Sequence, residues 1–192
     1  MKTALVLIDI QNDYFPGGRM ELVESLEASH RAQEVLAAFR NNGDDIVHIQ
    51  HLSTRPNATF FLPNTPGAEI HAQVSPLPGE TVLVKHFPNS FRGTGLHETL
   101  AARQIERIVF VGMMTHMCID TTVRAAFDLG YKCVLLGDGC ATKDLTYQSR
   151  TIPANDVNFA YFSAINGMFA DVKTSREFLS ESSNEPRLTD AK

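Results

Sequence analysis

The stretch RIVFVGMMTHMCIDTTVRAAFDLGYKCVLL, residues 107–136, decides the fold because it holds one complete unit of strand, helix and strand. The apolar run Arg107–Val111 predicts a buried strand, Cys118–Leu129 has the apolar spacing of a helix, and Cys133–Leu136 predicts the next strand. Apolar runs without polar alternation are typical of strands that are covered on both faces, as in a parallel sheet. The stretch therefore indicates a β-α-β unit with a right-handed crossover.

The same alternation runs through the rest of the chain and indicates an α/β fold. Further strands are expected at Ala4–Ile8, Ile46–Gln50 and Thr81–Val84, with a weaker one at Ala170–Val172. Further helices are expected at Leu22–Phe39, Leu96–Arg103 and Asp156–Phe169.

Length and composition fit one globular domain. The chain has 192 residues, 43% of them hydrophobic, and we place a single domain at residues 1–180 and a polar tail at residues 181–192. Seventeen Lys and Arg against 22 Asp and Glu give a formal charge of -5, without the long basic run that would track a phosphate backbone. We therefore expect no nucleic-acid partner.

The apolar start, MKTALVLIDI, is too short for a membrane span because Asp9 and Gln11 interrupt it, and it has no cleavage-site pattern. The three cysteines are odd in number and lack C-x-x-C spacing, which argues against a disulfide scaffold and against a structural zinc site. These features predict a cytoplasmic protein with free thiols and no membrane partner.

Three residues with chemical potential follow predicted strands. In an open α/β sheet, ligands bind beyond the carboxyl ends of the strands, which is where Asp9, Lys85 and Cys118 fall. A helix N-terminus and a lysine would both favour a Cys118 thiolate, and Asp9 could take the thiol proton and return it to a leaving group. Each residue also has a structural alternative: packing for Cys118, a turn for Asp9 and a solvated surface position for Lys85.

Four segments carry a family resemblance: ALVLIDIQNDYF (4–15), VLVKHFPNSFRGTGL (82–96), VFVGMMTHMCIDTTVRAAFDLGY (109–131) and VLLGDGCAT (134–142). They resemble the isochorismatase-like cysteine hydrolase family. The resemblance implies a doubly wound, Rossmann-like sheet of six mainly parallel strands with helices on both faces. It also implies a catalytic triad at Asp9, Lys85 and Cys118, and assembly into dimers or tetramers.

The resemblance further implies a cis peptide between Met113 and Met114, which would aim the N–H groups of Met114 and Cys118 at one oxyanion. The predicted reaction is hydrolysis of a small-molecule amide or related C–N bond through a thioester on Cys118. The alternative within the family is vinyl ether hydrolysis of the isochorismatase type, which some members perform without the cysteine.

No metal or other cofactor is expected. Nicotinamidases of this family carry an Asp-x-His pair near the second strand end, whereas this sequence has His48 and His51 without it. Residues three apart on a strand point to opposite faces, so these two histidines should not share an ion.

The wall of the site should contain several aromatic side chains suited to a small, flat, largely apolar substrate. The proline-rich insert Ser53–Gly79 is expected to form a wall or lid of this site. The candidate substrate-binding residues are Phe15, His51, Phe60, Phe61, Phe87, Phe91 and His116. Cys133 and Cys140 are interpreted as buried packing residues.

Two other classes of protein use related architectures. A nucleotide-binding or flavin-binding module would need a glycine-rich phosphate loop after the first strand, and IDIQNDYF offers none. A thiol-redox protein would need a resolving cysteine close to Cys118 in the sequence, and none is there.

Overall fold

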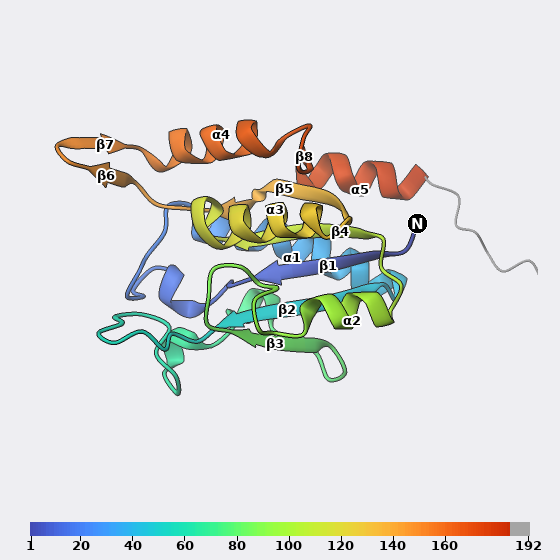
Figure 1. Ribbon diagram of the computed structural model, residues 1–192, viewed down its shortest axis with the longest axis horizontal. Coiled ribbons are helices and arrows are strands. Elements are labelled where there is room, and N and C mark those ends of the chain that lie inside the picture. The colour runs from blue at the N-terminus through green and yellow to red at the C-terminus, as the bar shows by residue number, and fades with distance from the viewer. Residues whose placement is uncertain (185–192) are drawn as a thin grey trace, which may run out of the picture.

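The computed structural model describes residues 1–184 and is built around a six-stranded parallel sheet (Figure 1). The strands are β1 (Thr3–Ile8), β2 (Asp45–His51), β3 (Thr81–Lys85), β4 (Arg107–Met113), β5 (Lys132–Ala141) and β8 (Asp171–Lys173). Their order is β3-β2-β1-β4-β5-β8, and every neighbouring pair is parallel. The doubly wound α/β fold predicted for the chain is confirmed.

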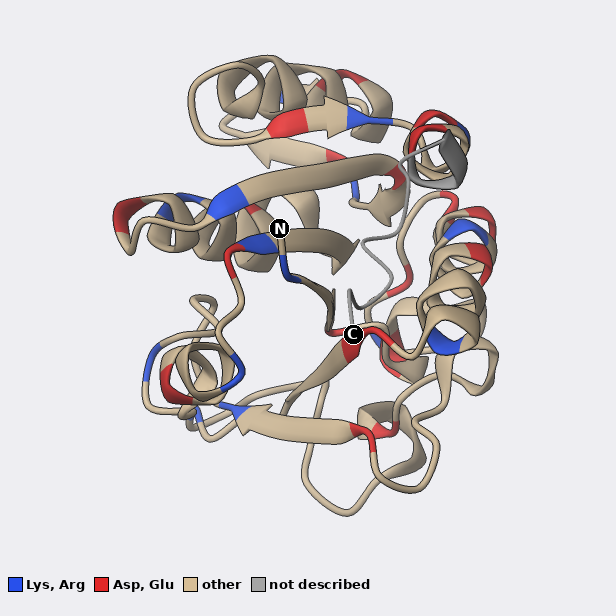
Figure 2. Cartoon of the chain, turned by 90° about the vertical axis from the view of Figure 1, so that its right-hand side faces the viewer, with Lys and Arg blue, Asp and Glu red and all other residues tan. Residues whose placement is uncertain are grey.

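Helices cover both faces of the sheet (Figure 2). They are α1 (Ser25–Asn42), α2 (Leu96–Ala102), α3 (Asp120–Asp128), α4 (Ala154–Ile165) and α5 (Ser175–Asn184). On one face α1 and α5 meet through stacked rings of Phe39 and Phe178, whose centroids lie 6.1 Å apart. On the other face, Leu100 of α2, Val123 of α3 and Ile165 of α4 join one apolar cluster.

The central strands are buried because both of their faces are covered. In β1 every residue from Ala4 to Ile8 is at most 2% exposed, as the continuous apolar run predicted. The edge strand β3 differs, because Val82 and Val84 on one of its faces are about 40% exposed. All six strands overlap the segments predicted from the sequence.

The sheet has one topological switch point. From β1 the chain winds outward to β2 and β3, and the order then returns to β4 on the other side of β1. The carboxyl ends of β1 and β4 therefore diverge into different connections and leave a crevice, where ligands bind in open α/β sheets. Gly112 allows the two strands to approach there, because a Cβ atom on it would meet the Ile8 carbonyl oxygen.

Several elements were not predicted. A two-stranded antiparallel hairpin, β6 (Leu145–Tyr147) and β7 (Arg150–Ile152), projects beyond the carboxyl edge of the sheet (Figure 1). The insert after β2 holds two short 3-10 turns, η2 (Pro66–Ala68) and η3 (Ala72–Val74). Helix α5 continues through Asn184, past the boundary predicted at residue 180, and residues 185–192 of the predicted tail lie outside the described part.

None of the helices within residues 1–184 is both long enough and apolar enough to span a membrane.

Candidate active site

Asp9 and Lys85 form a fully buried ion pair at the carboxyl edge of the sheet. Asp9 directly follows β1, and its backbone has φ 53°, a left-handed conformation that costs free energy and clusters at functional sites. Its N–H donates to the Ile49 carbonyl, which fixes the turn against β2. Lys85 ends β3, and its Nζ lies 2.8 Å from Asp9 Oδ2.

Cys118 completes the cluster. It lies in η4 (Thr115–Ile119), a π-helical turn between β4 and α3, and is 4% exposed. The peptide bond between Met113 and Met114, at the start of this turn, is cis. The Cys118 Sγ, a carboxylate oxygen of Asp9 and a ring nitrogen of His51 all lie within 4.8 Å of one another. The three residues selected at strand ends therefore meet at one point.

The surroundings of Cys118 oppose ionisation of its thiol, whereas the sequence led us to expect a thiolate. Burial raises the pKa of this thiol far above its ordinary value, and the negative charge of Asp9 raises it further. Lys85 lowers the pKa of Cys118, but by less than burial and Asp9 together raise it. The turn before α3 is also π-helical, so the sulfur does not stand at the simple α-helix N-terminus that the sequence argument assumed.

The charges of Asp9 and Lys85 each stabilise the ionised form of the other side chain. Burial opposes ionisation of Asp9, but the ammonium of Lys85 and contacts with His51 hold the pKa of Asp9 below its usual range. Burial likewise opposes protonation of Lys85, yet the negative charge of Asp9 and the Cys118 sulfur raise the pKa of Lys85. These directions favour a site with an anionic Asp9, a cationic Lys85 and a protonated Cys118 thiol. Asp9 Oδ1 has no hydrogen-bond partner among residues 1–184.

A polar clamp missed by the sequence analysis holds Lys85. Its Nζ donates to the Pro88 carbonyl at 2.9 Å. The loop that carries Pro88 is tied to α3, because the Ser90 N–H donates to Thr122 Oγ1 at 3.0 Å and the two hydroxyl groups are also 3.0 Å apart. Ser90 and Thr122 are completely buried. No spacing rule links residues 90 and 122, so only the fold reveals this clamp.

Two polar side chains after β1 anchor the proline-rich insert. The Gln11 side chain donates to the carbonyls of His51 and Ala68 and accepts the His51 N–H. The buried Asp13 carboxylate accepts the Phe61 N–H at 2.6 Å. These bonds hold the insert against the site, consistent with its predicted role as a wall.

His51 reaches the triad, and His48 does not. His51 Nδ1 lies 3.7 Å from Asp9 Oδ2, whereas His48 Nε2 lies 2.9 Å from Glu80, next to Arg40 of α1. The two histidines therefore have different partners, as expected for residues three apart on a strand. Asp9, His51 and Cys118 could together offer three metal ligands. The Lys85 ammonium sits on the same Asp9 carboxylate, however, and would repel a divalent cation.

The predicted aromatic wall divides into two groups. Phe60 and the fully buried Phe61 pack around Tyr14, and the Phe61 ring lies 5.8 Å from that of His51. The remaining predicted side chains contact other partners: Phe15 stacks on His71, Phe87 lies under the Arg92 guanidinium, Phe91 stacks on Tyr131, and His116 contacts Thr142 and Tyr161.

Phe91 is misplaced by the sequence argument. Tyr131, its stacking partner, directly precedes β5 and belongs to the amino end of the sheet, so the chain after Pro88 has turned back from the triad. His116 points toward β5 and α4, and no interaction joins it to Asp9, Lys85 or Cys118 within the described residues. Neither placement supports contact with a substrate at Cys118.

Tyr14 is a site residue that the sequence analysis missed. It is 1% exposed, and the pKa of its phenol is raised first by burial and then by the nearby Cys118, Asp9 and Asp13 side chains. It lies inside the segment 4–15 that carried the family resemblance, which was the available signal. The other cysteines, Cys133 and Cys140, are buried, and burial raises the pKa of each thiol to about 12.

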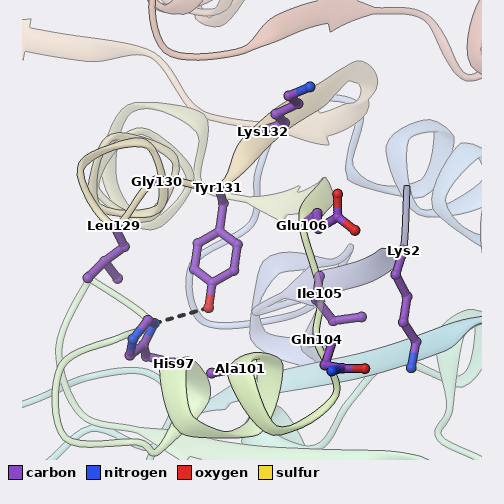
Figure 3. Close-up of a pocket in the computed structure, with 10 residues that line it drawn as sticks. All are labelled: Lys2, His97, Ala101, Gln104, Ile105, Glu106, Leu129, Gly130, Tyr131 and Lys132. Atoms are coloured by element: carbon purple, nitrogen blue, oxygen red, sulfur yellow. Dashed lines mark hydrogen bonds between the residues drawn. The ribbon is translucent and has the colours of Figure 1, made fainter.

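A separate open cavity of about 740 Å³ lies away from this cluster (Figure 3). Residues at the amino ends of β1, β4 and β5, with parts of α2 and the end of α3, line it. They include Lys2, His97, Glu106, Tyr131 and Lys132, and none of the triad residues. The Lys132 ammonium points away from the Tyr131–His97 pair in Figure 3, so the polar groups do not converge on one ligand position.

Fold and site together define a class of protein: a doubly wound α/β chain with a buried cysteine beside an Asp–Lys pair at the switch point. Residues 3–166 match the family model described as the Isochorismatase domain. The chain belongs to the isochorismatase family and is a hydrolase.

Three relatives illustrate the similarity. The isochorismatase family protein YddQ of Bacillus subtilis is 48% identical over 93% of this chain and 99% of its own. The crystal structure of an isochorismatase hydrolase from Oleispira antarctica has a TM-score of 0.90 at 44% identity and covers 93% of this chain and 96% of its own. The crystal structure of N-carbamoylsarcosine amidase from Thermoplasma acidophilum has a TM-score of 0.77 at 27% identity and covers 91% of this chain and 97% of its own.

Proposed function

We propose that the protein is a cofactor-free cysteine hydrolase that cleaves an amide or related C–N bond of a small molecule. The observation that carries this proposal is the buried Asp9–Lys85 pair beside the Cys118 sulfur. A relative of known fold bears the name of an amidase, N-carbamoylsarcosine amidase, which supports C–N chemistry. The presence of Cys118 favours this chemistry over vinyl ether hydrolysis.

The charge balance of the site explains how a thiol with a raised pKa can serve as a nucleophile. One buried cation, Lys85, stabilises one anion at a time. Moving the proton from Cys118 Sγ to Asp9 exchanges one anion for another without changing the net charge of the buried site. The Lys85 ammonium can stabilise either anion, so the thiolate forms when it attacks instead of persisting in the free enzyme.

In the acylation step, Sγ attacks the substrate carbonyl carbon while Asp9 accepts the thiol proton. The carbonyl oxygen becomes an oxyanion, for which the N–H groups of Met114 and Cys118 are the proposed donors. The intermediate then collapses: the C–N bond breaks, Asp9 protonates the leaving nitrogen, and an acyl thioester remains on Cys118.

In the deacylation step Asp9 acts first as a base toward water and then as an acid toward the Cys118 sulfur. Asp9, again ionised, accepts a proton from a water molecule that attacks the thioester carbonyl. The C–S bond breaks, the acid product leaves, and the thiolate recovers its proton from Asp9. Atoms and charge balance over the cycle, and no further reactant is required.

His51, Phe60, Phe61 and Tyr14 are the proposed contacts for the substrate, because they surround the cluster on the side of the insert. Aromatic walls of this kind suit a small, flat substrate.

The proposal is tested with a panel of small amides, N-carbamoyl compounds and isochorismate, assayed with chelator-treated protein. We expect turnover of a compound with a C–N bond, and loss of at least about 1,000-fold in Cys118→Ala and Asp9→Asn. Cys140→Ala is the matched control, since Cys140 is equally buried but lies outside the cluster. Turnover of isochorismate alone, or activity that returns only when a metal is added, would contradict the proposal.

A further inference from the structure

The proposed oxyanion donors, the N–H groups of Met114 and Cys118, lie just before η4 and within it. Bonds inside this turn shape it, because the Met114 carbonyl accepts the N–H groups of Met117 and Ile119 at 3.0 and 3.3 Å. A donor stabilises an oxyanion only at a distance of about 3 Å, so the turn must also be fixed relative to the sheet that carries Asp9 and Lys85. The contacts that fix it therefore bear on catalysis.

The end of β5 holds this turn from outside. Met113 pairs with Ala141 in the β4–β5 ladder, and the Thr115 hydroxyl donates to the Ala141 carbonyl at 3.3 Å. His116 makes the next contact along the chain, because its Nδ1 lies 2.6 Å from Thr142 Oγ1. These contacts lie on both sides of Met114 in the sequence and tie the turn to the sheet.

The contact between His116 and Thr142 is built into the protein interior. Thr142 is fully buried, and its carbonyl accepts the Val23 N–H at 2.9 Å, which holds it against the segment before α1. Within residues 1–184 the Thr142 hydroxyl bonds to no group other than His116. The His116 ring is half-buried and meets the Tyr161 ring of α4 edge-on, with the two centroids 6.1 Å apart. The imidazole therefore joins the turn to both β5 and α4.

We propose that His116 is a positioning residue for the hydrolysis: its contacts with Thr142 and Tyr161 hold η4 so that the Met114 and Cys118 N–H groups face one oxyanion. The inference rests on the proposed function and adds to it a residue that does not touch the reacting atoms. His116 acts through the backbone of the turn, since its own side chain points toward β5 and α4.

The location of His116 predicts which kinetic constant it controls. Three of the proposed substrate contacts, His51, Phe60 and Phe61, belong to the end of β2 and to the insert, and no bond links them to His116 within the described part of the chain. Loss of the His116 anchor should therefore leave substrate binding intact. It should weaken an interaction that is made only in the transition state, which lowers kcat and leaves KM unchanged.

The test compares His116→Leu with His116→Asn on the best amide of the panel. Leucine removes the bond to Thr142, whereas asparagine places a hydrogen-bonding atom as many bonds from the backbone as Nδ1 of histidine. We expect kcat to fall roughly 10- to 100-fold in His116→Leu with KM within about twofold of the parent, and His116→Asn to recover most of that loss.

His97→Leu is the matched control. The His97 Nδ1 lies 3.0 Å from the Tyr131 hydroxyl, and the two rings meet edge-on with centroids 5.9 Å apart. The same kinds of contact are therefore lost, but at the amino end of the sheet. His97→Leu should keep the parental kcat, and a loss equal to that of His116→Leu would overturn the proposal.

Three further kinetic results would overturn it: an unchanged kcat in His116→Leu, a raised KM at the parental kcat, which would make His116 a substrate contact, or equal losses in His116→Leu and His116→Asn. Because His116→Leu could fail to fold, Thr142 provides a second pair of variants. Thr142→Val keeps the shape of the side chain without its hydroxyl and should lower kcat, whereas Thr142→Ser keeps the hydroxyl and should recover most of the activity. Equal activity of these two variants would also overturn the proposal.

Hydrogen exchange separates this inference from the proposed function, because it needs no substrate. The Met117 and Ile119 amides should exchange at least about tenfold faster in His116→Leu than in the parent or in His116→Asn. A parent that cleaves no C–N bond would contradict the proposed function, and the exchange rates would still decide whether His116 holds the turn. Parental exchange rates in His116→Leu would overturn the inference.

Discussion

Lys85 Nζ lies 2.8 Å from Asp9 Oδ2, and both side chains are excluded from solvent. Removing one partner leaves the other charge buried and uncompensated. We expect Lys85→Met to lower the free energy of unfolding by about 3–5 kcal/mol at pH 7, measured by urea denaturation.

The double variant Asp9→Asn/Lys85→Met is the control for that prediction. It removes both charges, so it should be more stable than Lys85→Met alone. Equal stability of the single and double variants would show that the pair is not coupled as described.

Removing the charge of Asp9 should make the Cys118 thiol more reactive toward an alkylating agent, although it abolishes catalysis. Because Asp9 raises the pKa of Cys118 and Lys85 lowers it, Asp9→Asn should lower that pKa. Iodoacetamide should therefore alkylate Cys118 faster at pH 7.5 in Asp9→Asn than in the parent, by about tenfold or more, although Asp9→Asn no longer turns over substrate. Peptide mass spectrometry follows each cysteine, with Cys133 and Cys140 as internal controls. Slower alkylation in Asp9→Asn would contradict the charge account.

The clamp on Lys85 predicts an effect from a residue that does not touch the triad. Thr122→Val removes the hydroxyl that holds Ser90 and, through it, the loop with Pro88. We expect kcat to fall about tenfold with little change in KM, since Lys85 is misplaced while the insert is intact. Thr121→Val is the control, because its hydroxyl donates to the Met117 carbonyl one turn earlier and has no bond to Ser90 or Pro88 within residues 1–184. Equal effects of the two variants would argue against the clamp.

Stability at low pH should depend on Glu80. The Arg40 guanidinium, and to a lesser degree the Leu77 N–H and His48, lower the pKa of Glu80 from 4.5 to about 2 in spite of partial burial. A carboxyl group with a lowered pKa contributes stability that is present above the unfolded value and is lost as pH falls through the folded one. The unmodified protein should therefore lose stability more steeply than Glu80→Gln between pH 4.5 and 2. Parallel curves from urea titrations at each pH would contradict this.

The sequence predicted the sheet because its strands are buried on both faces, which leaves a continuous apolar run such as Ala4–Ile8. It also selected Asp9, Lys85 and Cys118, since parallel strands bring their carboxyl ends to one edge. Both results depend on local patterns that the topology then combines.

Other features depend on the path of the chain between strands. Phe91 follows Lys85 by six residues, yet the loop carries it to Tyr131 at the other end of the sheet. The hairpin at Leu145–Ile152 has mostly polar residues and no apolar run to identify it. The state of the Cys118 thiol was also beyond the sequence, because it depends on burial and on the net effect of two opposite charges.

In the proposed reaction Cys118 carries the acyl group of the substrate. The most direct measurement is intact-protein mass spectrometry after acid quenching during turnover of the best amide from the panel, followed by peptide mapping. We expect a mass increase equal to the acyl portion of that substrate, located on Cys118 and absent from Cys118→Ala. Steady turnover by Cys118→Ala at the parental rate, or an acyl group on another residue, would contradict it.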